Sequence, residues 1–301
     1  MLDDIVGLPN GARFYRCDLH THTPMDKRFH SDGWPLDTED QKRAFARHLV
    51  RHVRVERGLD ILGVTEHNDV TWLPYIQEAA AEVGLIVFPG VEIGAMTGHK
   101  TVHLLALFSP GTPAEHIHHW LSSLGLVPGE RFHNDGTPRV VQHPTLKLTE
   151  SIHQQQNGYS AIAIAAHASG PNGLFHSLEG EARVLAYNDP RILAVEIPDT
   201  RERLPRFERQ LVSGELLDSY GPKRVACLNH SDGRCIVDHD GLVAIGTRAT
   251  YIKLSSPSVE GLRQAFLDHE SRVRLLSERN DHHFPRIVGV MVDGGFLRYG
   301  F

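Results

Sequence analysis

Short apolar segments alternate with longer helical segments along most of the 301-residue sequence, and this alternation is typical of α/β folds. The apolar segments carry Val, Ile or Leu at most positions, as strands do when both faces of a parallel sheet are buried. They cover residues 13–19, 60–66, 85–93, 101–108, 160–168, 192–198 and 224–231. Seven strands separated by helices in a chain of this length predict a barrel of βα units.

The segments between the strands have recognisable helix ends. Residues 37–58 begin with a candidate N-cap, Asp37 or Thr38, and end at Gly58, a residue suited to the left-handed turn after a helix. Further helices are predicted over residues 71–84, 113–125, 199–214 and 258–273. The stretch 125–150 is rich in Gly and Pro, which predicts an irregular loop or insertion.

Composition indicates a globular protein of the cytoplasm. The sequence is 41% hydrophobic and 23% charged, and it contains neither a secretory signal nor an apolar run long enough to span a membrane. The three cysteines, Cys17, Cys227 and Cys235, follow no disulfide or metal-knuckle spacing, which suits a reducing compartment. The net charge of −6 and the lack of a basic stripe weaken the case for a long nucleic-acid partner without excluding one.

Histidine is abundant, with 21 residues, and two His-x-His pairs occur. Chance placement would give about one such pair, so the spacing alone is weak support for a metal site. The pair at His116 and His118 lies in a helical pattern and is interpreted as a solvated helix face. The pair at His20 and His22 follows the first strand, and each other predicted strand also carries a potential ligand near its carboxyl end. These candidates are Glu66, His67, Glu92, His103, His167, Glu196, His230 and Asp232. In an α/β barrel such ends converge on one mouth, so we expect the side chains to meet there.

Six motifs in this order resemble the PHP (polymerase and histidinol phosphatase) domain family: "DLHTHT", "TEHND", "PGVEI", "VHLLAL", "AAHAS" and "NHSDG". The resemblance covers residues 13–245 and implies a distorted (β/α)7 barrel of the PHP type over residues 1–245, with a C-terminal extension over 246–301. The segments "GARFYRCDLHTHTP" and "SPSVEGLRQAFLDHESRVRL" are most similar to the N-terminal PHP module of TrlF-type proteins, which precedes an SMC-like ATPase, and "VDGGFLRYGF" is similar to the strand that enters such ATPases. No P-loop motif follows, so such an ATPase would be a missing domain or a separate partner.

The resemblance also implies two or three divalent metal ions, Zn, Mn or Fe rather than Mg. The ligands that it implies are His20, His22 and Asp232 for one ion, His103 and His167 with the bridging Glu92 for a second, and His67 with His30 for a third. Family members usually carry Asp before the second-motif histidine and His two residues after the last aspartate. This chain has Glu66 and Arg234 there, both near the third ion, which we therefore expect not to be held in the usual way.

These residue types fit a metal-dependent hydrolase acting on phosphoester bonds. Imidazoles and carboxylates suit Zn, Mn and Fe(II), and paired ions activate water and neutralise phosphoryl oxygens. Glu92, Asp232 and Arg234 are the predicted catalytic residues. Arg234 either grips a phosphate in place of the third ion or forms a structural ion pair. Glu66 and Glu196 either bind metal or orient the imidazoles.

Three functions remain open for such a centre. A nuclease or other phosphodiesterase is favoured by the resemblance to modules joined to SMC-like ATPases, and a basic rim around the mouth would support it. A phosphatase of a small phosphorylated metabolite would have a deep, closed pocket. A metal-binding regulatory domain without catalysis would have an occluded mouth. The expected partners are a phosphoester substrate, including nucleic acid, and an SMC-like ATPase; no membrane partner is expected.

Overall fold

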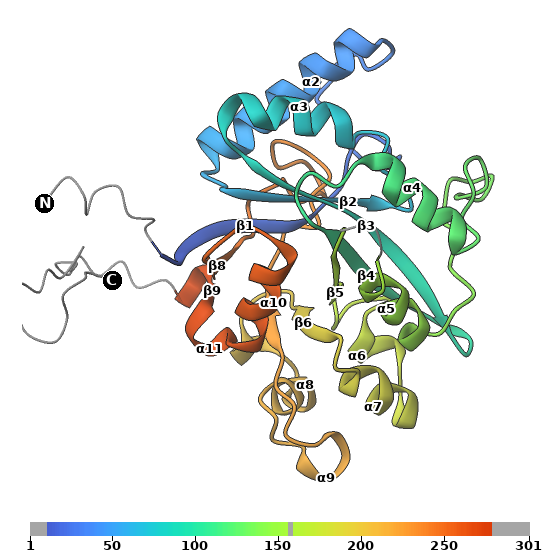
Figure 1. Ribbon diagram of the computed structural model, residues 1–301, viewed down its shortest axis with the longest axis vertical. Helices are drawn as coiled ribbons and strands as arrows, with labels where there is room; N and C mark the ends of the chain where they lie inside the picture. Colours follow the sequence, from blue (N-terminus) through green and yellow to red (C-terminus); the bar gives the residue numbers. More distant parts are fainter. Residues whose placement is uncertain (1–10, 156–158, 279–301) are drawn as a thin grey trace, which may run out of the picture.

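Nine strands form one sheet in the computed structural model, which describes residues 11–155 and 159–278. The strands lie in the order β7-β6-β5-β4-β3-β2-β1-β8-β9. Their bounds are β1 Arg13–Thr21, β2 Ile61–His67, β3 Ile86–Thr97, β4 Lys100–Phe108, β5 Ala161–Ala165, β6 Ile192–Glu196, β7 Ala226–Leu228, β8 Thr250–Leu254 and β9 Val273–Leu275. The end strands β7 and β9 approach each other, so the sheet curls into a nearly closed barrel (Figure 1). The predicted α/β barrel is confirmed.

One strand of the barrel runs against the predicted direction. β4 pairs antiparallel with both β3 and β5, whereas β1, β2 and β3 are mutually parallel. The cause is the connection: only Gly98, with φ of +63°, and His99 separate β3 from β4, and so short a link can join only antiparallel strands. The prediction of an all-parallel sheet is therefore wrong for β4. His103 still reaches the mouth because it lies in the first half of the strand, opposite Gly94 of β3.

The longer helices cover the outside of the barrel. They are α2 Glu39–Arg51, α3 Leu73–Val83, α4 Ala114–Ser123, α5 Thr145–His153, α7 Gly180–Asn188 and α8 Arg206–Val212, with the shorter α6 Leu174–Ser177 and α9 Leu217–Tyr220. α2 and α3 pack side by side, and α3 contacts β3 (Figure 1). Thr38 caps α2: its side chain accepts a hydrogen bond from the backbone N–H of Gln41. The Gln41 side chain in turn accepts one from the backbone N–H of Thr38. None of the described helices is long and apolar enough to cross a bilayer.

Two helix predictions and one loop prediction differ from the structure in detail. The helix predicted over 37–58 changes to a π-helical turn at His52–Glu56. The helix predicted over 199–214 is broken before Pro205, because a proline disfavours helical geometry in the residue that precedes it, and α8 starts only at Arg206. The predicted loop 125–150 contains the start of α5.

His116 and His118 on α4 are half-buried rather than solvated. His116 bonds Gln155, and His118 Nδ1 accepts from Arg131. The motif "VDGGFLRYGF" lies outside the described residues.

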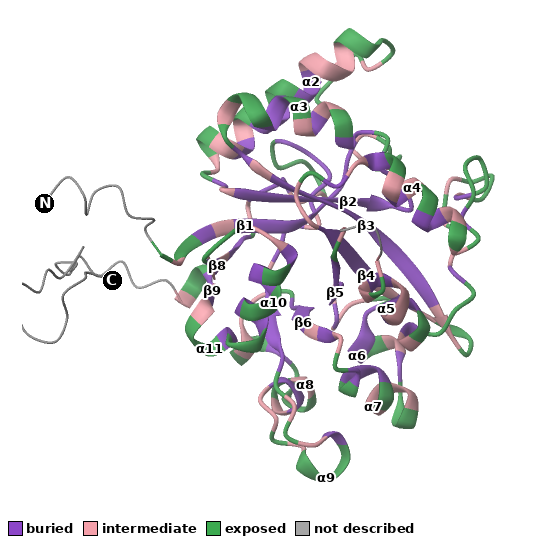
Figure 2. Ribbon diagram, in the orientation of Figure 1, coloured by how far each residue is buried: buried purple, intermediate pink, exposed green. Residues whose placement is uncertain are grey.

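Two apolar cores hold the fold together, one inside the barrel and one between the sheet and the outer helices. The strands are buried along most of their length, whereas the helices expose their outer sides (Figure 2). The inner core includes side chains of α10 (Val259–Leu267), among them Leu262 and Phe266. β8 runs antiparallel to β1 with Leu254 opposite Arg13, so the chain reaches α10 at the amino end of β1. A short helix, α11 (His269–Arg272), then leads to β9. The boundary placed at residue 245 stays a prediction, but the segment after it continues the same sheet.

Candidate metal centre

The inward-facing positions of the strands are apolar in the middle of the barrel and carry ligand-type side chains at one mouth. Ile61 and His67 lie six positions apart in β2, and Phe88 and Glu92 four apart in β3; an even spacing places both members of a pair on one face. The same relation holds for Leu105 and His103 in β4, Ala194 and Glu196 in β6, and Leu228 and His230 at the end of β7. Two-residue alternation therefore aims these polar side chains into the mouth.

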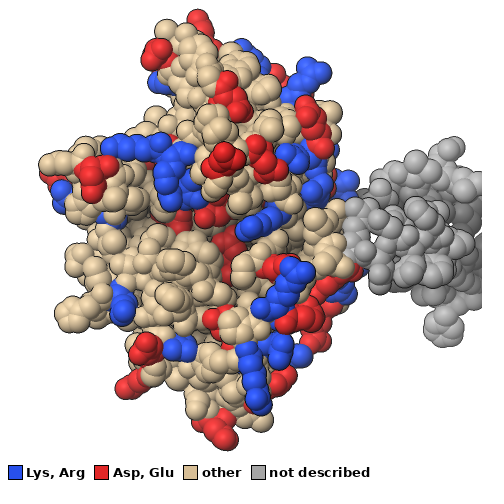
Figure 3. Space-filling model, turned by 180° about the vertical axis from the view of Figure 1, so that it is seen from behind, with Lys and Arg blue, Asp and Glu red and all other residues tan. Residues whose placement is uncertain are grey.

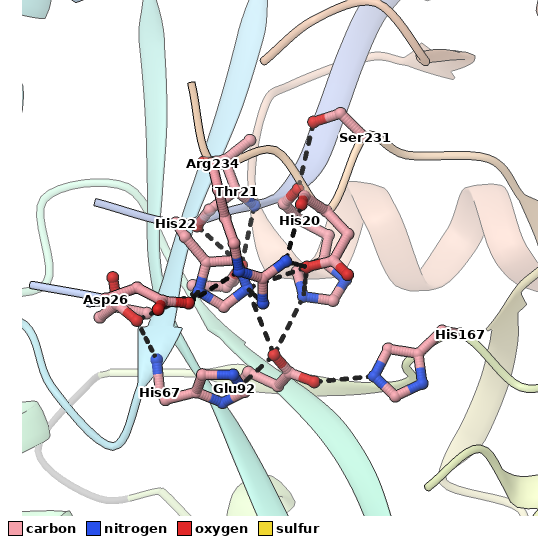
Figure 4. A network of polar contacts seen from close by, with 12 residues as sticks. His20, Thr21, His22, Asp26, His67, Glu92, His167, Ser231 and Arg234 are labelled. Carbon is pink, nitrogen blue, oxygen red and sulfur yellow. Dashed lines mark hydrogen bonds and ion pairs between the residues drawn. The ribbon is translucent and has the colours of Figure 1, made fainter. Parts of the chain in front are cut away.

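β1 reaches the mouth by a different route. Leu19 belongs to the inner core, so strict alternation would turn His20 and His22 away from it. The pairing of β1 with β2 shifts register between Asp18 and Thr21, and such an irregularity re-aims side chains. Both imidazoles consequently point towards the other ligand-type residues (Figure 4).

Gly63 of β2 makes room for this irregularity. A Cβ at this position would lie 2.5 Å from the backbone oxygen of Leu19. Thr21 also donates its hydroxyl hydrogen to the Gly63 carbonyl at 2.6 Å. The close approach of the two backbones therefore depends on a residue without a side chain.

The carboxylate of Glu92 lies at the middle of the cluster, with its side chain 1% exposed. Oε1 is 2.6 Å from Nδ1 of His103 and 2.9 Å from Nε2 of His167. Oε2 is 3.2 Å from Nε2 of His20 and 3.3 Å from Nδ1 of His67. One carboxylate thus connects imidazoles from β1, β2, β4 and the end of β5. Figure 4 shows His20, His67 and His167 around it.

Asp232 completes the cluster from the loop after β7, where its φ of +49° turns the chain. Its Oδ1 is 2.9 Å from Nε2 of His22 and 3.4 Å from Nε2 of His20. Among the described residues, three groups of side chains have ligand atoms within 4.8 Å of one another. They are His20, His22, Glu92 and Asp232; His67, Glu92 and His103; and His22, Asp26 and His67.

Two further carboxylates orient the imidazoles of His20 and His22 by contacting their Nδ1 atoms. Glu196 Oε2 is 2.9 Å from Nδ1 of His20 and also accepts from the backbone N–H of His167 at 2.9 Å. Glu66 Oε1 is 3.1 Å from Nδ1 of His22, and Glu66 Oε2 accepts from the backbone of Thr23. Carboxylates on the far nitrogen of a ligating histidine fix its tautomer and ring orientation. Of the two roles considered for Glu66 and Glu196, their contacts favour this orienting one.

Arg234 and Asp26 border the cluster on the His22 side. The guanidinium donates to Asp26 Oδ2 at 2.7 Å and to Asp232 Oδ1 at 2.6 Å, so Arg234 forms the ion pair considered as one alternative. Its Nη2 also lies 2.7 Å from Nε2 of His22. Asp26 was not predicted as a site residue, because it belongs to an irregular loop in which no strand or helix period marks it.

His30 and His230 do not belong to the three groups of ligand atoms. The structure places His30 beside Asp32, with 3.3 Å between Nε2 and Oδ1, and stacks its ring on His239 at 3.8 Å. It does not bring His30 to His67. His230 is 2% exposed, and its Nδ1 lies 3.5 Å from Oε1 of Glu196.

The electrostatics follow from this burial. Desolvation alone would raise the pKa of the Glu92 carboxyl, but the imidazoles of His67, His103 and His20 hold this pKa well below its usual value. Burial lowers the pKa of His67 to about 4 despite the nearby Glu92, so its ring is neutral. Neighbouring histidines, against the effect of burial, bring the pKa of Asp232 to about 2. By contrast, burial is outweighed by nearby carboxylates at two other histidines, which raise the pKa of His20 and raise the pKa of His22 to about 10. The centre therefore combines ionised carboxylates with a neutral imidazole at His67 at neutral pH.

The donor set fits divalent metal ions. Atoms that each lie about 2.1 Å from one ion are roughly 3 Å apart from each other, which matches the spacing of His22, Asp232 and Glu92. In the neutral tautomer of His22 that donates from Nδ1 to Glu66, the Nε2 lone pair faces Asp232 Oδ1, and the Arg234 guanidinium is the cation that contacts both atoms in this structure. Imidazole with carboxylate suits Zn, Mn or Fe(II).

A pocket of about 750 Å³ opens beside the cluster and includes His67 and His103 in its wall. Basic side chains line it as well, namely Lys27, Arg28 and Arg139. On the face opposite that of Figure 1, acidic side chains lie deep in a hollow with basic side chains around it (Figure 3). This volume is in the range of small-molecule sites.

The wall of the pocket opposite the strands is formed by residues 132–140. Asn68, next to His67, donates from Nδ2 to the Arg139 carbonyl at 2.8 Å, and Lys27 donates to the Asp135 carbonyl at 2.9 Å. Both bonds tie this segment to the loops of the mouth.

No family model and no curated protein matches the sequence. Among solved structures the chain is similar to a protein described as a metal-dependent phosphoesterase from Bifidobacterium adolescentis, at 18% identity and a TM-score of 0.48 over 76% of this chain and 92% of that chain. It is similar to a two-domain protein from Bacteroides vulgatus described as containing a PHP-like metal-dependent phosphoesterase, at 17% identity and a TM-score of 0.50 over 88% of this chain and 65% of that chain. A third is an amidohydrolase from Chromobacterium violaceum with bound sulfate and no metal, at 14% identity and a TM-score of 0.45 over 86% of this chain and 97% of that chain. At such identities the likeness concerns architecture, and the chain shares the barrel fold of the PHP-like Bacteroides protein.

Proposed function

We propose that this protein is a PHP-type, metal-dependent phosphoesterase that hydrolyses phosphodiester bonds. The observation that carries the proposal is the position of Glu92, whose two carboxylate oxygens face imidazoles of two separate ligand groups at 2.6–3.4 Å. A carboxylate shared in this way is the arrangement by which proteins hold two ions close together. The similar structures that are described as metal-dependent phosphoesterases support the same chemistry.

The first group that would hold an ion is His20, His22, Glu92 and Asp232, and the second is His67, Glu92 and His103, with His167 Nε2 bonded to the same Glu92 oxygen. Bound divalent ions would supply Lewis-acid polarisation of a phosphoryl oxygen and lower the pKa of a water molecule. The protein itself fixes the ligand geometry through Glu66 and Glu196, and it provides the pocket for the organic part of the substrate.

A nucleic-acid strand is the substrate that we propose for this activity. Lys27, Arg28 and Arg139 line the pocket beside the cluster, and basic side chains along a groove suit a phosphate backbone. The Arg139 side chain is exposed and has no hydrogen-bond or ion-pair partner among the described residues, so it is available to a phosphate. A nearby SMC-like ATPase, as a further domain or a partner, belongs to the same proposal.

A second candidate, a phosphatase of a small phosphorylated metabolite, is favoured by the wall that residues 132–140 form. This segment and the strands enclose a space of about 750 Å³, which is large enough for a nucleotide-sized molecule.

Hydrolysis of bis-p-nitrophenyl phosphate and p-nitrophenyl phosphate with added Mn, Zn or Mg tests the proposal. We expect diester cleavage that is lost in His22→Ala, because His22 belongs to the first ligand group. His119→Ala, a change at an exposed histidine of α4, is the matched control and should retain activity. A preference for the monoester would favour the phosphatase, and metal binding without any turnover would contradict the enzyme proposal.

A further inference from the structure

The guanidinium of Arg234 lies among the ligand-type atoms at one side of the centre (Figure 4). Nε donates to Asp26 Oδ2 at 2.7 Å, and Nη1 donates to Asp232 Oδ1 at 2.6 Å and to the Asp232 carbonyl at 2.9 Å. Nη2 lies 2.7 Å from Nε2 of His22. The side chain is only 9% exposed, so these contacts are made within the protein rather than shared with bulk water.

These partners overlap with the third group of ligand atoms, His22, Asp26 and His67. Arg234 bonds two of its three members. An arginine stays charged at any pH that a folded protein tolerates, and its planar fork is directional, so it cannot withdraw its charge by losing a proton. An ion of the third group needs the Asp26 carboxylate and would have to displace the Arg234–Asp26 hydrogen bond, whereas an ion of the first group leaves that bond in place.

We propose that Arg234 is a built-in cation of the centre, which takes the place of a metal ion between His22, Asp26 and His67 and limits the protein to two ions. The guanidinium of Arg234, rather than a bound ion, then supplies the positive charge that balances Asp26 and Asp232. This proposal rests on the proposed metal centre, but not on its catalytic activity.

Metal binding by His22 would break the contact between His22 Nε2 and Nη2 of Arg234. In the neutral tautomer of His22 that donates from Nδ1 to Glu66, Nε2 has one lone pair, which serves either the Arg234 N–H or a metal ion but not both. An ion in the first ligand group therefore releases the Nη2 group of Arg234. The released N–H groups are then available to a phosphoryl oxygen, while Nε and Nη1 remain held by Asp26 and Asp232.

Metal stoichiometry tests the proposal independently of hydrolysis. Protein saturated with Mn²⁺ and freed of excess metal is analysed by elemental mass spectrometry, and circular dichroism monitors the fold. The wild type should bind two ions per chain, and Arg234→Lys, which keeps a cation, should also bind two. Arg234→His removes the permanent charge and offers another imidazole, so it should bind a third ion. The double variant Arg234→His with Asp26→Asn should return to two, since the third ion needs the Asp26 carboxylate.

Three ions in the wild type would overturn the proposal even if no variant folds, and so would a folded Arg234→His that still binds two. No ion at all in the wild type would overturn both this proposal and the metal centre. Two ions without phosphoester hydrolysis would contradict the proposed function alone and leave the role of Arg234 supported.

Discussion

At the scale of single residues, the carboxylates that hydrogen-bond the candidate ligands determine how the imidazole rings are oriented. Glu196 bonds Nδ1 of His20 and the backbone N–H of His167, so one carboxylate positions ligand candidates from two strands. Pre-orientation of this kind lowers the entropy lost when an ion binds, and it fixes Nε2 of His20 as the nitrogen that faces Glu92.

Removing this carboxylate should weaken metal binding without unfolding the protein. We expect Glu196→Ala to lower metal affinity by about 10–100-fold, the usual effect of deleting a partner behind a ligating histidine. Glu196→Gln should lose less, because both hydrogen bonds end on Oε2 and an amide oxygen in that position still accepts them. Titration against a chelator of known affinity measures the change, with Glu202→Ala at an exposed position as the control. Equal affinity in Glu196→Ala and wild type would refute the orienting role.

At the scale of elements, the irregularity in β1 is what brings His20 and His22 to the same cluster as Glu92. It requires the backbone of Leu19 to pass directly over Gly63 of β2. The contact is between two backbones, so neither can rotate away as a side chain would.

Gly63→Ala should therefore both destabilise the protein and displace His20 and His22 from Glu92. Its Cβ would meet the Leu19 oxygen at 2.5 Å, and we expect a loss of about 1–3 kcal/mol in the free energy of unfolding, as for other overpacked sites. Gly94→Ala is the matched control, since its nearest neighbour is a Thr101 methyl group, which can shift. Urea unfolding of both variants gives the comparison. A larger loss in Gly94→Ala than in Gly63→Ala would contradict this explanation.

Some of these elements leave a pattern in the sequence, and others do not. The apolar runs predicted the barrel strands, and the ligand types at their ends predicted most of the cluster, because burial and alternation leave a local pattern. The direction of β4 leaves no such pattern in the strand itself; it follows from the short turn at Gly98. The shift in β1 depends on contact with Gly63, and the place of Asp26 depends on Arg234, which is distant in sequence. Contacts of that kind cannot be read from periodicity.

Lys223 connects the end of α7 to the chain that enters β7. Its ammonium donates to the carbonyls of Tyr187 and Asp189, which lie at the end of this helix and lack helical partners. Burial lowers the pKa of Lys223 to about 8, although Asp189 opposes this effect. The unfolded chain therefore retains this proton to a higher pH than the folded chain does.

This difference predicts a pH effect on stability. Between about pH 8 and the ordinary lysine value near 10.5, the unfolded state binds more protons, so the Lys223 contribution to the free energy of unfolding rises with pH. The wild type should gain stability relative to Lys223→Met between pH 7.5 and 10, whereas the same comparison with Lys147→Met, at a largely exposed lysine, should stay flat. Chemical denaturation at the two pH values measures both differences. A gap between wild type and Lys223→Met that narrows as pH rises would show that the sign is wrong.

At the scale of the whole molecule, the two ends of the barrel differ in what fills them. The carboxyl ends of β1, β2, β3 and β6 carry the metal centre, and the opposite end is filled by α10, whose apolar side chains enter the inner core. Of the strands that flank α10 in sequence, β8 pairs with β1, and β9 pairs with β8. The residues from 250 to 275 therefore complete the barrel at the end away from the site, although they carry none of the ligand candidates.

Neighbouring residues of α10 allow this role to be tested within one helix. Phe266 is 1% exposed and belongs to the inner core, whereas Leu267 is 59% exposed. We expect Phe266→Ala to lower the free energy of unfolding by about 3–5 kcal/mol, the usual loss for a buried phenylalanine, and Leu267→Ala to change it by less than about 0.5 kcal/mol. The loss should appear in a single transition that also releases bound metal, because an emptied inner core weakens the strands that hold the ligands at the far mouth. If Phe266→Ala instead melted a separate, early transition while metal stayed bound, the segment after residue 245 would be an appendage rather than the floor of the barrel.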